Sequence, residues 1–218
     1  MPGHPKGGGE RSNAYSSQRF TNWRPHDPYW DEVEALPRKM RPRAQVDRDP
    51  AAPLGIFERP LAEGFVRPWT VRDVADVLGA IPQGFLVDLS GVFLLGGTAK
   101  QRGLTKLTYG MYSAWYGSTS GHRVFLCAVP ENRLALKWSK MRKPSVVREY
   151  TKFGATINPD GTGGAVVKFD LSSLRQYYLY DVLLHEIGHH VDREDRADNA
   201  ERYANWFAEY QHARLLEG

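Results

Sequence analysis

The chain has 218 residues, a formal net charge of +4, 41% hydrophobic and 12% aromatic side chains. This composition excludes a chain that is disordered throughout and favours one folded domain with a long tail, while the single cysteine excludes an intramolecular disulfide framework. No apolar run is long enough to span a membrane, and the first thirty residues lack the apolar core of a Sec-type signal peptide. We therefore expect a cytoplasmic protein, or one secreted by a route that needs no such signal.

The first 62 residues differ in composition from the rest of the chain. Nine of the fourteen prolines lie in residues 1–60, among Gly, Ser and Arg and without apolar periodicity. Such sequence buries too little surface to offset its ordering entropy. We expect a largely disordered Pro/Gly/Arg-rich arm over residues 1–62, with a candidate helical turn at Pro28–Leu36, and a folded domain over residues 63–218.

The folded domain is predicted to begin with a helix and to continue as strands. Thr70 and Asp73 form a capping box ahead of apolar residues at helical spacing. Short runs rich in Val, Leu, Phe and Tyr follow, separated by Gly and Pro. They predict strands over Phe85–Leu95, Leu107–Tyr116 and Arg123–Val129.

A hairpin and two helices complete the predicted elements. The hairpin pairs Thr151–Ile157 with Ala165–Asp170 around an Asn-Pro-Asp-Gly turn. The capping boxes Ser173–Gln176 and Asp198–Glu201 predict helices over about 174–191 and 199–216. The predicted fold class is therefore α+β, with a small mixed sheet and two closing helices.

Charge is unevenly distributed along the chain. Residues 100–152 hold eleven Lys and Arg but two acids, whereas residues 181–218 hold nine acids and four Arg. Within the basic region, the segment 137–143 combines four basic residues with Trp138, which is a candidate contact for nucleic acid. No nucleic-acid-binding motif accompanies it, so we favour solvated charges on an edge strand or loop.

The strongest chemical signal is the HExxH pattern formed by His185, Glu186 and His189. Residues four apart lie on one face of a helix, so both imidazoles can point at one ion. Zinc binds imidazole nitrogens at about 2.0–2.1 Å in tetrahedral geometry. Glu186 lies about 100° around the helix, where its carboxylate can reach a water molecule and act as a general base. His190 points away from this face, and we expect a flanking contact for it.

A catalytic zinc site needs a third protein ligand and an open fourth position. Asp195 would complete a metzincin-like pattern, but that pattern needs Gly at position 192, where this chain has Asp. Glu201, on the next predicted helix, is the second candidate, and Glu209 is the third. Gly188, which costs helix stability relative to Ala, suggests close backbone packing beneath the site.

The string from Glu201 to Ala208 reads ExxANxFA. Together with HExxH, it resembles the signature of the gluzincin-like zinc peptidases of the ImmA/IrrE type, which cleave phage-type or stress-response repressors. The resemblance implies a zincin-like fold in which His185, His189 and Glu201 bind zinc and Glu186 is the general base. In related gluzincins an Asp that supports a metal histidine often stands where this chain has Asn205.

Several further residues are candidates for supporting roles. Asp181, one turn before His185, is a second possible partner of a metal ligand. The group that stabilises an oxyanion would be Tyr, His or Arg, and the sequence leaves four candidates open: His122, Tyr203, Tyr210 and His212. By the same resemblance, the strand Ala165–Asp170 is a candidate edge strand for pairing with an extended substrate.

These observations predict a zinc-dependent metalloendopeptidase whose partner is a protein or peptide substrate and which does not associate with membranes. Three alternatives stay open. The first is a regulator-cleaving or nucleic-acid-associated protease that uses the basic segment. The second is an exported effector or toxin protease, and the third is a non-enzymatic zinc-binding module.

Overall fold

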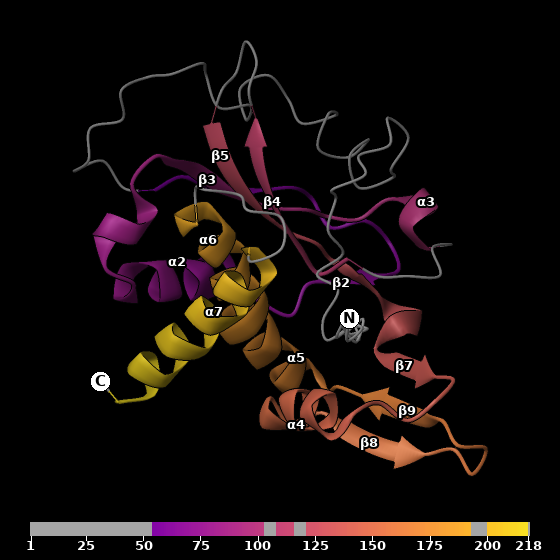
Figure 1. Cartoon of the computed structure of the whole chain (residues 1–218). Helices are drawn as coiled ribbons and strands as arrows, with labels where there is room; N and C mark the ends of the chain where they lie inside the picture. Colours follow the sequence, from indigo (N-terminus) through magenta and orange to yellow (C-terminus); the bar gives the residue numbers. More distant parts are fainter. Residues whose placement is uncertain (1–53, 103–107, 116–120, 193–199, 218) are drawn as a thin grey trace, which may run out of the picture.

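The computed structural model describes residues 54–102, 108–115, 121–192 and 200–217. The chain forms an α+β fold in which helices cover one side of a mixed sheet (Figure 1). The elements in chain order are β1 (Ile56–Glu58), β2 (Phe65–Val66), α2 (Val71–Ala80), the 3₁₀ turn η3 (Gln83–Leu86), β3 (Leu89–Leu94), α3 (Ala99–Arg102), β4 (Gly110–Trp115), β5 (Gly121–Leu126), β6 (Val129–Pro130), the 3₁₀ turn η4 (Glu131–Arg133), β7 (Ala135–Trp138), α4 (Pro144–Lys152), β8 (Thr156–Pro159), β9 (Ala165–Lys168), α5 (Leu171–Tyr177), the π-helical segment η5 (Tyr178–Val182), α6 (Leu183–Val191) and α7 (Ala200–Glu217).

The main sheet has the strand order β1-β3-β5-β4. β1, β3 and β5 are parallel, and β4 is an antiparallel strand at one edge. β3 ends in a continuous apolar run that starts at Val92 and extends one residue past the strand to Leu95, all buried. Such a run is typical of a strand covered on both faces. One face carries stacked rings, with Phe93 lying 4.8 Å from Phe57 and 5.3 Å from Phe125 between centroids.

A second antiparallel sheet, in the order β7-β9-β8, lies near the start of α5, away from the main sheet (Figure 1). Between the two sheets runs one long helical element made of α5, η5 and α6. α6 packs against β4 and β5, and α7 packs along α6 and η5. This arrangement brings the HExxH motif to the antiparallel edge of the main sheet. None of the described helices combines the length and hydrophobicity that crossing a membrane would require.

Several sequence predictions are confirmed. α2 begins at the Thr70–Asp73 capping box, in which Asp73 N donates to Thr70 Oγ1 and Thr70 N donates to Asp73. The predicted hairpin exists as β8 and β9, and the last helix is α7. The predicted helical turn at residues 28–36 and the capping residue Asp198 lie outside the described residues.

Other predictions are wrong in their bounds. Phe85 and Leu86, predicted as the start of a strand, belong to the 3₁₀ turn η3, because Pro82 and the buried Leu86 place this stretch against α6. Residues 151 and 152 end a helix, α4, which the strand prediction overlooked. The helix predicted from Leu174 begins at Leu171, since the Asp170 side chain accepts from Ser173 N and is the true N-cap.

A short strand lies within the predicted arm. Residues 56–58 form β1, which pairs in parallel with β3 through Ile56–Val92, Phe57–Phe93 and Glu58–Leu94. The composition of the arm concealed this strand because it has only three residues, too few for a periodic pattern. Residues 56–58 of the predicted arm therefore belong to the main sheet.

Candidate metal centre

Two histidines of α6 lie one helical turn apart and face the same point. The Nε2 atoms of His185 and His189 are 3.0 Å apart, and their rings meet nearly at right angles, with centroids 4.7 Å apart. His185 is buried, and His189 is partly exposed. This is the geometry expected for an HExxH helix, because the fourth residue along returns to the same face.

The first turn of α7 adds a carboxylate to this pair. Glu201 Oε2 lies 3.6 Å from His185 Nε2, and Glu201 Oε1 lies 3.7 Å from His189 Nε2. All three donor groups fall within 4.8 Å of one another. Ligand atoms about 2.0 Å from a tetrahedral ion are roughly 3.3 Å apart, so the three observed separations fit one divalent ion.

The alternatives for the third ligand have different fates. Glu209 lies two turns further along α7, is exposed, and does not belong to the cluster. Asp195 lies outside the described residues. Among the described residues, His185, His189 and Glu201 form the one group of His, Cys, Asp or Glu side chains arranged to hold an ion.

Close packing of two helices brings Glu201 to the histidines. Gly188 lies against Ala204 so tightly that a Cβ at position 188 would be 2.7 Å from Ala204 Cα. Ala204 and Ala208 are both buried on the facing side of α7. The glycine that weakens α6 as a helix therefore permits the approach of α7, as its position in the motif suggested.

His185, a member of the cluster, and Glu186 beside it are buried and have strongly shifted pKa values. Burial and, to a smaller extent, the neighbouring His189 lower the pKa of His185 to about 3, while a hydrogen bond with the Asn205 side chain acts in the opposite direction. His185 is therefore neutral at pH 7, the form in which an imidazole can bind a metal. Asn205 of α7 is thus a hydrogen-bond partner of His185.

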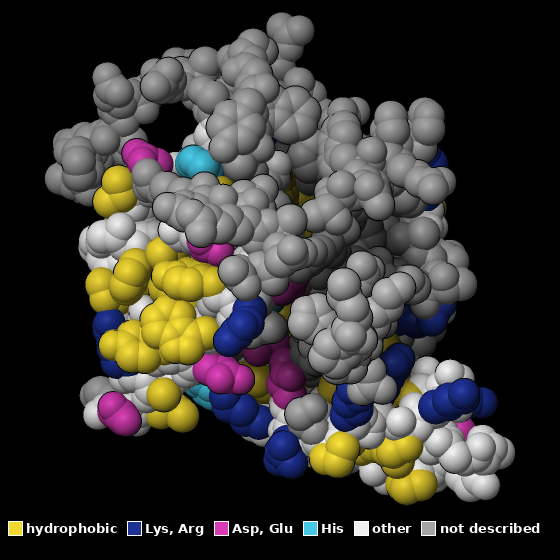
Figure 2. Space-filling model, in the orientation of Figure 1, with side chains coloured by type: hydrophobic (Ala, Val, Ile, Leu, Met, Phe, Trp, Pro, Cys, Tyr) yellow, Lys and Arg dark blue, Asp and Glu magenta, His cyan; other side chains and the backbone are white. Residues whose placement is uncertain are grey.

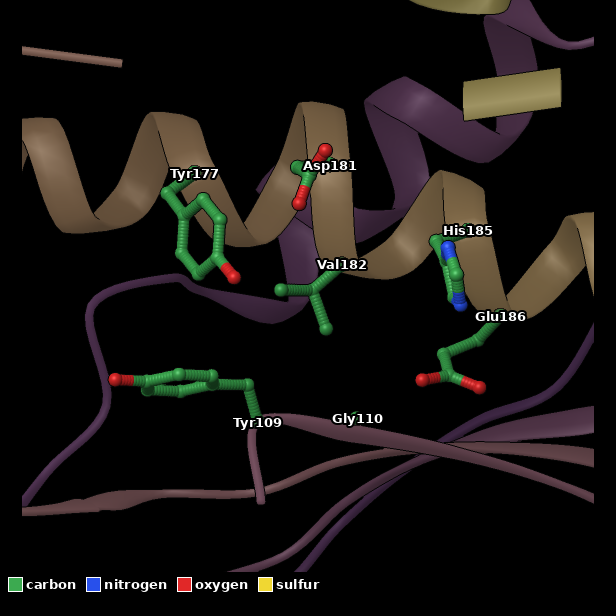
Figure 3. Close-up of a pocket in the computed structure, with 7 residues that line it drawn as sticks. All are labelled: Tyr109, Gly110, Tyr177, Asp181, Val182, His185 and Glu186. Carbon is green, nitrogen blue, oxygen red and sulfur yellow. The ribbon is translucent and has the colours of Figure 1, made fainter. Parts of the chain in front are cut away.

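Glu186 points from α6 toward β4 and is 2% exposed (Figure 3). Burial raises its pKa well above the usual range, the Glu201 carboxylate adds to the rise, and the backbone N–H of Tyr112 opposes it by donating to the carboxylate. Gly110 leaves the space that Glu186 occupies, since a Cβ there would lie 2.9 Å from Glu186 Cγ. A cation held next to Glu186 would favour its ionised form.

The rings of Tyr112 and His122, from the main sheet, lie beside the three metal-donor side chains; we call these two rings the ring cluster. The Tyr112 hydroxyl lies 2.5 Å from His122 Nδ1, and the Tyr112 ring stacks 6.3 Å from the His189 ring. His190 Nε2 bonds the Val87 carbonyl at 2.9 Å. His190 is therefore a packing contact, as expected. Tyr112 was overlooked in the sequence, where no motif marks it.

The four candidates for oxyanion stabilisation are separated by the fold. His122 is part of the ring cluster beside His189 and contacts Tyr112. Burial and the Asp192 carboxylate at the end of α6 raise the pKa of Tyr203. Tyr210 is half exposed and stacks on Trp206, on the part of α7 where Figure 2 shows a group of hydrophobic side chains.

His212 points elsewhere. Its ring is stacked on Phe153 at 5.3 Å and on Tyr180 at 5.2 Å, and burial lowers its pKa. Its place is between α4 and η5 rather than beside Glu201. The segment 137–143 is placed as we favoured: Lys137 is exposed on β7, an edge strand of the small sheet.

The prediction that the strand Ala165–Asp170 is an edge strand for substrate pairing is wrong. Residues 165–168 form β9, which is the central strand of its sheet and is paired with β7 on one side and β8 on the other. A strand paired on both sides has no free edge for addition. β4 lies at the end of the main sheet instead, directly beneath α6.

Comparison with known proteins finds no matching family model, no matching curated protein and no matching solved structure. The class of this site therefore has to be argued from its geometry. That geometry defines a His/His/Glu donor set with a buried carboxyl group beside it.

Proposed function

We propose that this protein is a zinc-dependent metallopeptidase of the zincin type. The observation that carries the proposal is the joint placement of three donor groups within 4.8 Å of one another, with an acid, Glu186, on the helix that carries the two histidines. Two imidazoles and one carboxylate, with a fourth position left open, are typical of catalytic rather than structural zinc sites. This supports an enzyme over a non-enzymatic zinc-binding module.

Each residue has a defined task in the proposed reaction. His185, His189 and Glu201 would hold the ion, which when bound supplies a Lewis acid and lowers the pKa of water. Glu186 accepts the proton of the attacking water and passes it to the leaving amine. Its buried position excludes bulk water from that transfer. Asn205 orients His185 through their hydrogen bond.

The arrangement around the site also supports a peptide as substrate. β4 is an antiparallel edge strand beside α6, so its outer side can pair with an extended chain. The contribution of Glu201 from a following helix, packed through Ala204 and Ala208, agrees with the resemblance to ImmA/IrrE-type peptidases. A regulatory protein is the class of substrate that this resemblance implies.

Metal content of purified variants tests the ligand set. The wild type should hold about one zinc per chain, and His185→Ala and Glu201→Ala should each lose it. Glu209→Ala is the matched control, because it removes a glutamate of the same helix that lies outside the cluster, and it should keep the metal. A wild type without zinc, or Glu201→Ala with full zinc, would contradict the proposed site.

Hydrolysis of an unstructured protein such as casein tests the general base. Glu186→Gln preserves the shape of the side chain but not its proton acceptor, so it should keep zinc and lose activity by a factor of about 10² or more. Equal rates for the variant and the wild type would show that Glu186 does not transfer the proton.

A further inference from the structure

A pocket opens between η5, the start of α6 and the residues around the start of β4. It is lined by Tyr109, Gly110, Tyr177, Asp181, Val182, His185 and Glu186 (Figure 3). The rings of Tyr109 and Tyr177 meet edge to face, with centroids 5.5 Å apart. Because Gly110 has no side chain, nothing projects from the strand between these rings and Glu186. The pocket therefore adjoins the proposed general base.

The carboxyl group of Asp181 lines this pocket. Asp181 makes no hydrogen bond or ion pair with any described residue, although it is partly buried. Lys152 is the cation that lowers the pKa of Asp181. Its side chain is exposed, and its ammonium lies over the Phe153 ring, 5.3 Å from the centroid. An acid that is partly removed from water without a partner weakens folding. Such groups are frequent where a ligand supplies the missing partner.

The electrostatics of this region favour a positive ligand. The pKa of Asp181 is raised to about 7, chiefly by burial; Lys152 opposes the rise and the Glu209 carboxylate adds to it. Asp181 and Glu201 both act in turn to raise the pKa of Glu186. An ion bound at Glu201 would offset the charge of that carboxylate. A cation beside Asp181, one turn before His185, would stabilise the ionised form of this second acid.

The size of the pocket restricts that cation. Its volume is about 20 Å³, which is room for roughly one water-sized group. An ammonium group is compact, whereas a guanidinium is broad and planar. The rings of Tyr109 and Tyr177, which line the pocket, can cover the aliphatic stem of a lysine and attract its charge.

We infer that this pocket is a side-chain subsite that binds a substrate lysine next to the scissile bond, with Asp181 pairing with the ammonium. The inference rests on the proposed peptidase function of the same site. It predicts that the enzyme prefers a lysine at one position of its substrates and selects against an acidic residue there.

The test compares peptides that differ at one position. Fluorogenic peptide sets carry Lys, Arg, norleucine or Glu at each position around the scissile bond; norleucine matches the lysine stem without the charge. The wild type should cleave the Lys peptide at least about tenfold faster, as kcat/KM, than the norleucine peptide at one position, with Arg between them. In Asp181→Asn this Lys-to-norleucine ratio should fall to near one, and in the control Glu217→Gln, which changes an exposed acid at the far end of α7, it should be unchanged.

A binding measurement separates this inference from the proposed catalysis. Fluorescence anisotropy of labelled Lys and norleucine peptides on full-length Glu186→Gln should show about tenfold tighter binding of the Lys peptide, and addition of Asp181→Asn should abolish the difference. Equal binding of the two peptides, or a preference that survives Asp181→Asn, overturns the subsite. Preferential binding without hydrolysis by the wild type would instead contradict the peptidase proposal and leave the lysine site standing.

Discussion

Replacement of Gly188 by alanine isolates the contact that joins the two halves of the metal centre. Gly188 lies in α6, between the two histidines of the motif, and Ala204 lies one turn after Glu201 in α7. A Cβ at position 188 would be 2.7 Å from Ala204 Cα, 3.1 Å from Ala204 O and 3.2 Å from Ala204 Cβ. Optimal carbon contacts are about 3.5–4.0 Å. The two helices would therefore have to separate by roughly 1 Å at this crossing.

Two opposing terms decide the effect of Gly188→Ala on stability. Alanine gains about 1 kcal/mol over glycine inside a helix. Overpacking a tight contact typically costs about 1–3 kcal/mol, and here the contact is with backbone atoms, which cannot rotate away. We expect a net loss of about 0–2 kcal/mol in the free energy of unfolding.

The larger effect should appear in metal binding. A shift of roughly 1 Å in α7 exceeds the tolerance of about 0.2 Å in metal–ligand distances, and Glu201 is carried by the first turn of that helix. We expect zinc affinity to fall by a factor of about 10–100, which is the range found when groups supporting a metal ligand are changed. Competition with a chromophoric chelator measures the affinity, and urea unfolding of the metal-free protein measures the stability.

Gly79→Ala provides the matched control. Gly79 is an exposed residue of α2, and a Cβ there would meet nothing within 4 Å. This variant should gain about 0.5–1 kcal/mol and keep its zinc affinity. If Gly188→Ala behaved in the same way, with a gain in stability and unchanged zinc affinity, the tight crossing of α6 and α7 would be refuted.

Three further predictions concern the surroundings of the site. Gly110→Val would place a Cβ 2.5 Å from Val182 Cγ1; it should reduce peptide hydrolysis and cost about 1–3 kcal/mol, and full activity would show that β4 does not approach α6 so closely. The folded chain holds the Asp181 proton up to about pH 7, whereas the ordinary pKa is 3.8, so stability falls as the pH rises between these values. Asp181→Asn removes that loss and should stabilise the metal-free protein by about 1–2 kcal/mol at pH 8 and not at pH 4, after allowance for partial exposure; an equal gain at both pH values in urea unfolding would exclude an electrostatic cause. The Tyr178 hydroxyl donates to the buried Cys127 carbonyl at 2.7 Å, so Tyr178→Phe should cost about 1–2 kcal/mol, and an unchanged thermal unfolding midpoint would contradict this.

Two acids of the site, one buried and one partly buried, lower the stability of the folded protein. Asp181 and Glu186 both have raised pKa values because burial disfavours their charged forms. Neither is required by the packing of the helix, whose buried face is supplied by Leu183, Leu184 and Ile187. Acids at such positions are more readily explained by binding and proton transfer than by folding.

Local sequence determined the parts of this protein that depend on neighbours along the chain. The facing pair His185 and His189 follows from the pitch of one helix, and the start of α2 follows from the capping box at Thr70. The Ser173 cap failed because Asp170, three residues earlier, offered the same interaction one turn sooner. Competing local signals of equal strength cannot be ranked without the packing that selects between them.

Tertiary structure decided everything that depends on contact between distant segments. The sequence left Glu201, Asp195 and Glu209 open as third ligands, and the crossing of α6 with α7 brings Glu201 within 3.6–3.7 Å of both histidines. The closeness of β4, the hydrogen bond from Tyr112 to Glu186 and the pocket around Asp181 gave no signal in the sequence. They arise where a sheet edge meets a helix more than sixty positions later, and such pairings are set by the burial of the whole core rather than by any local pattern.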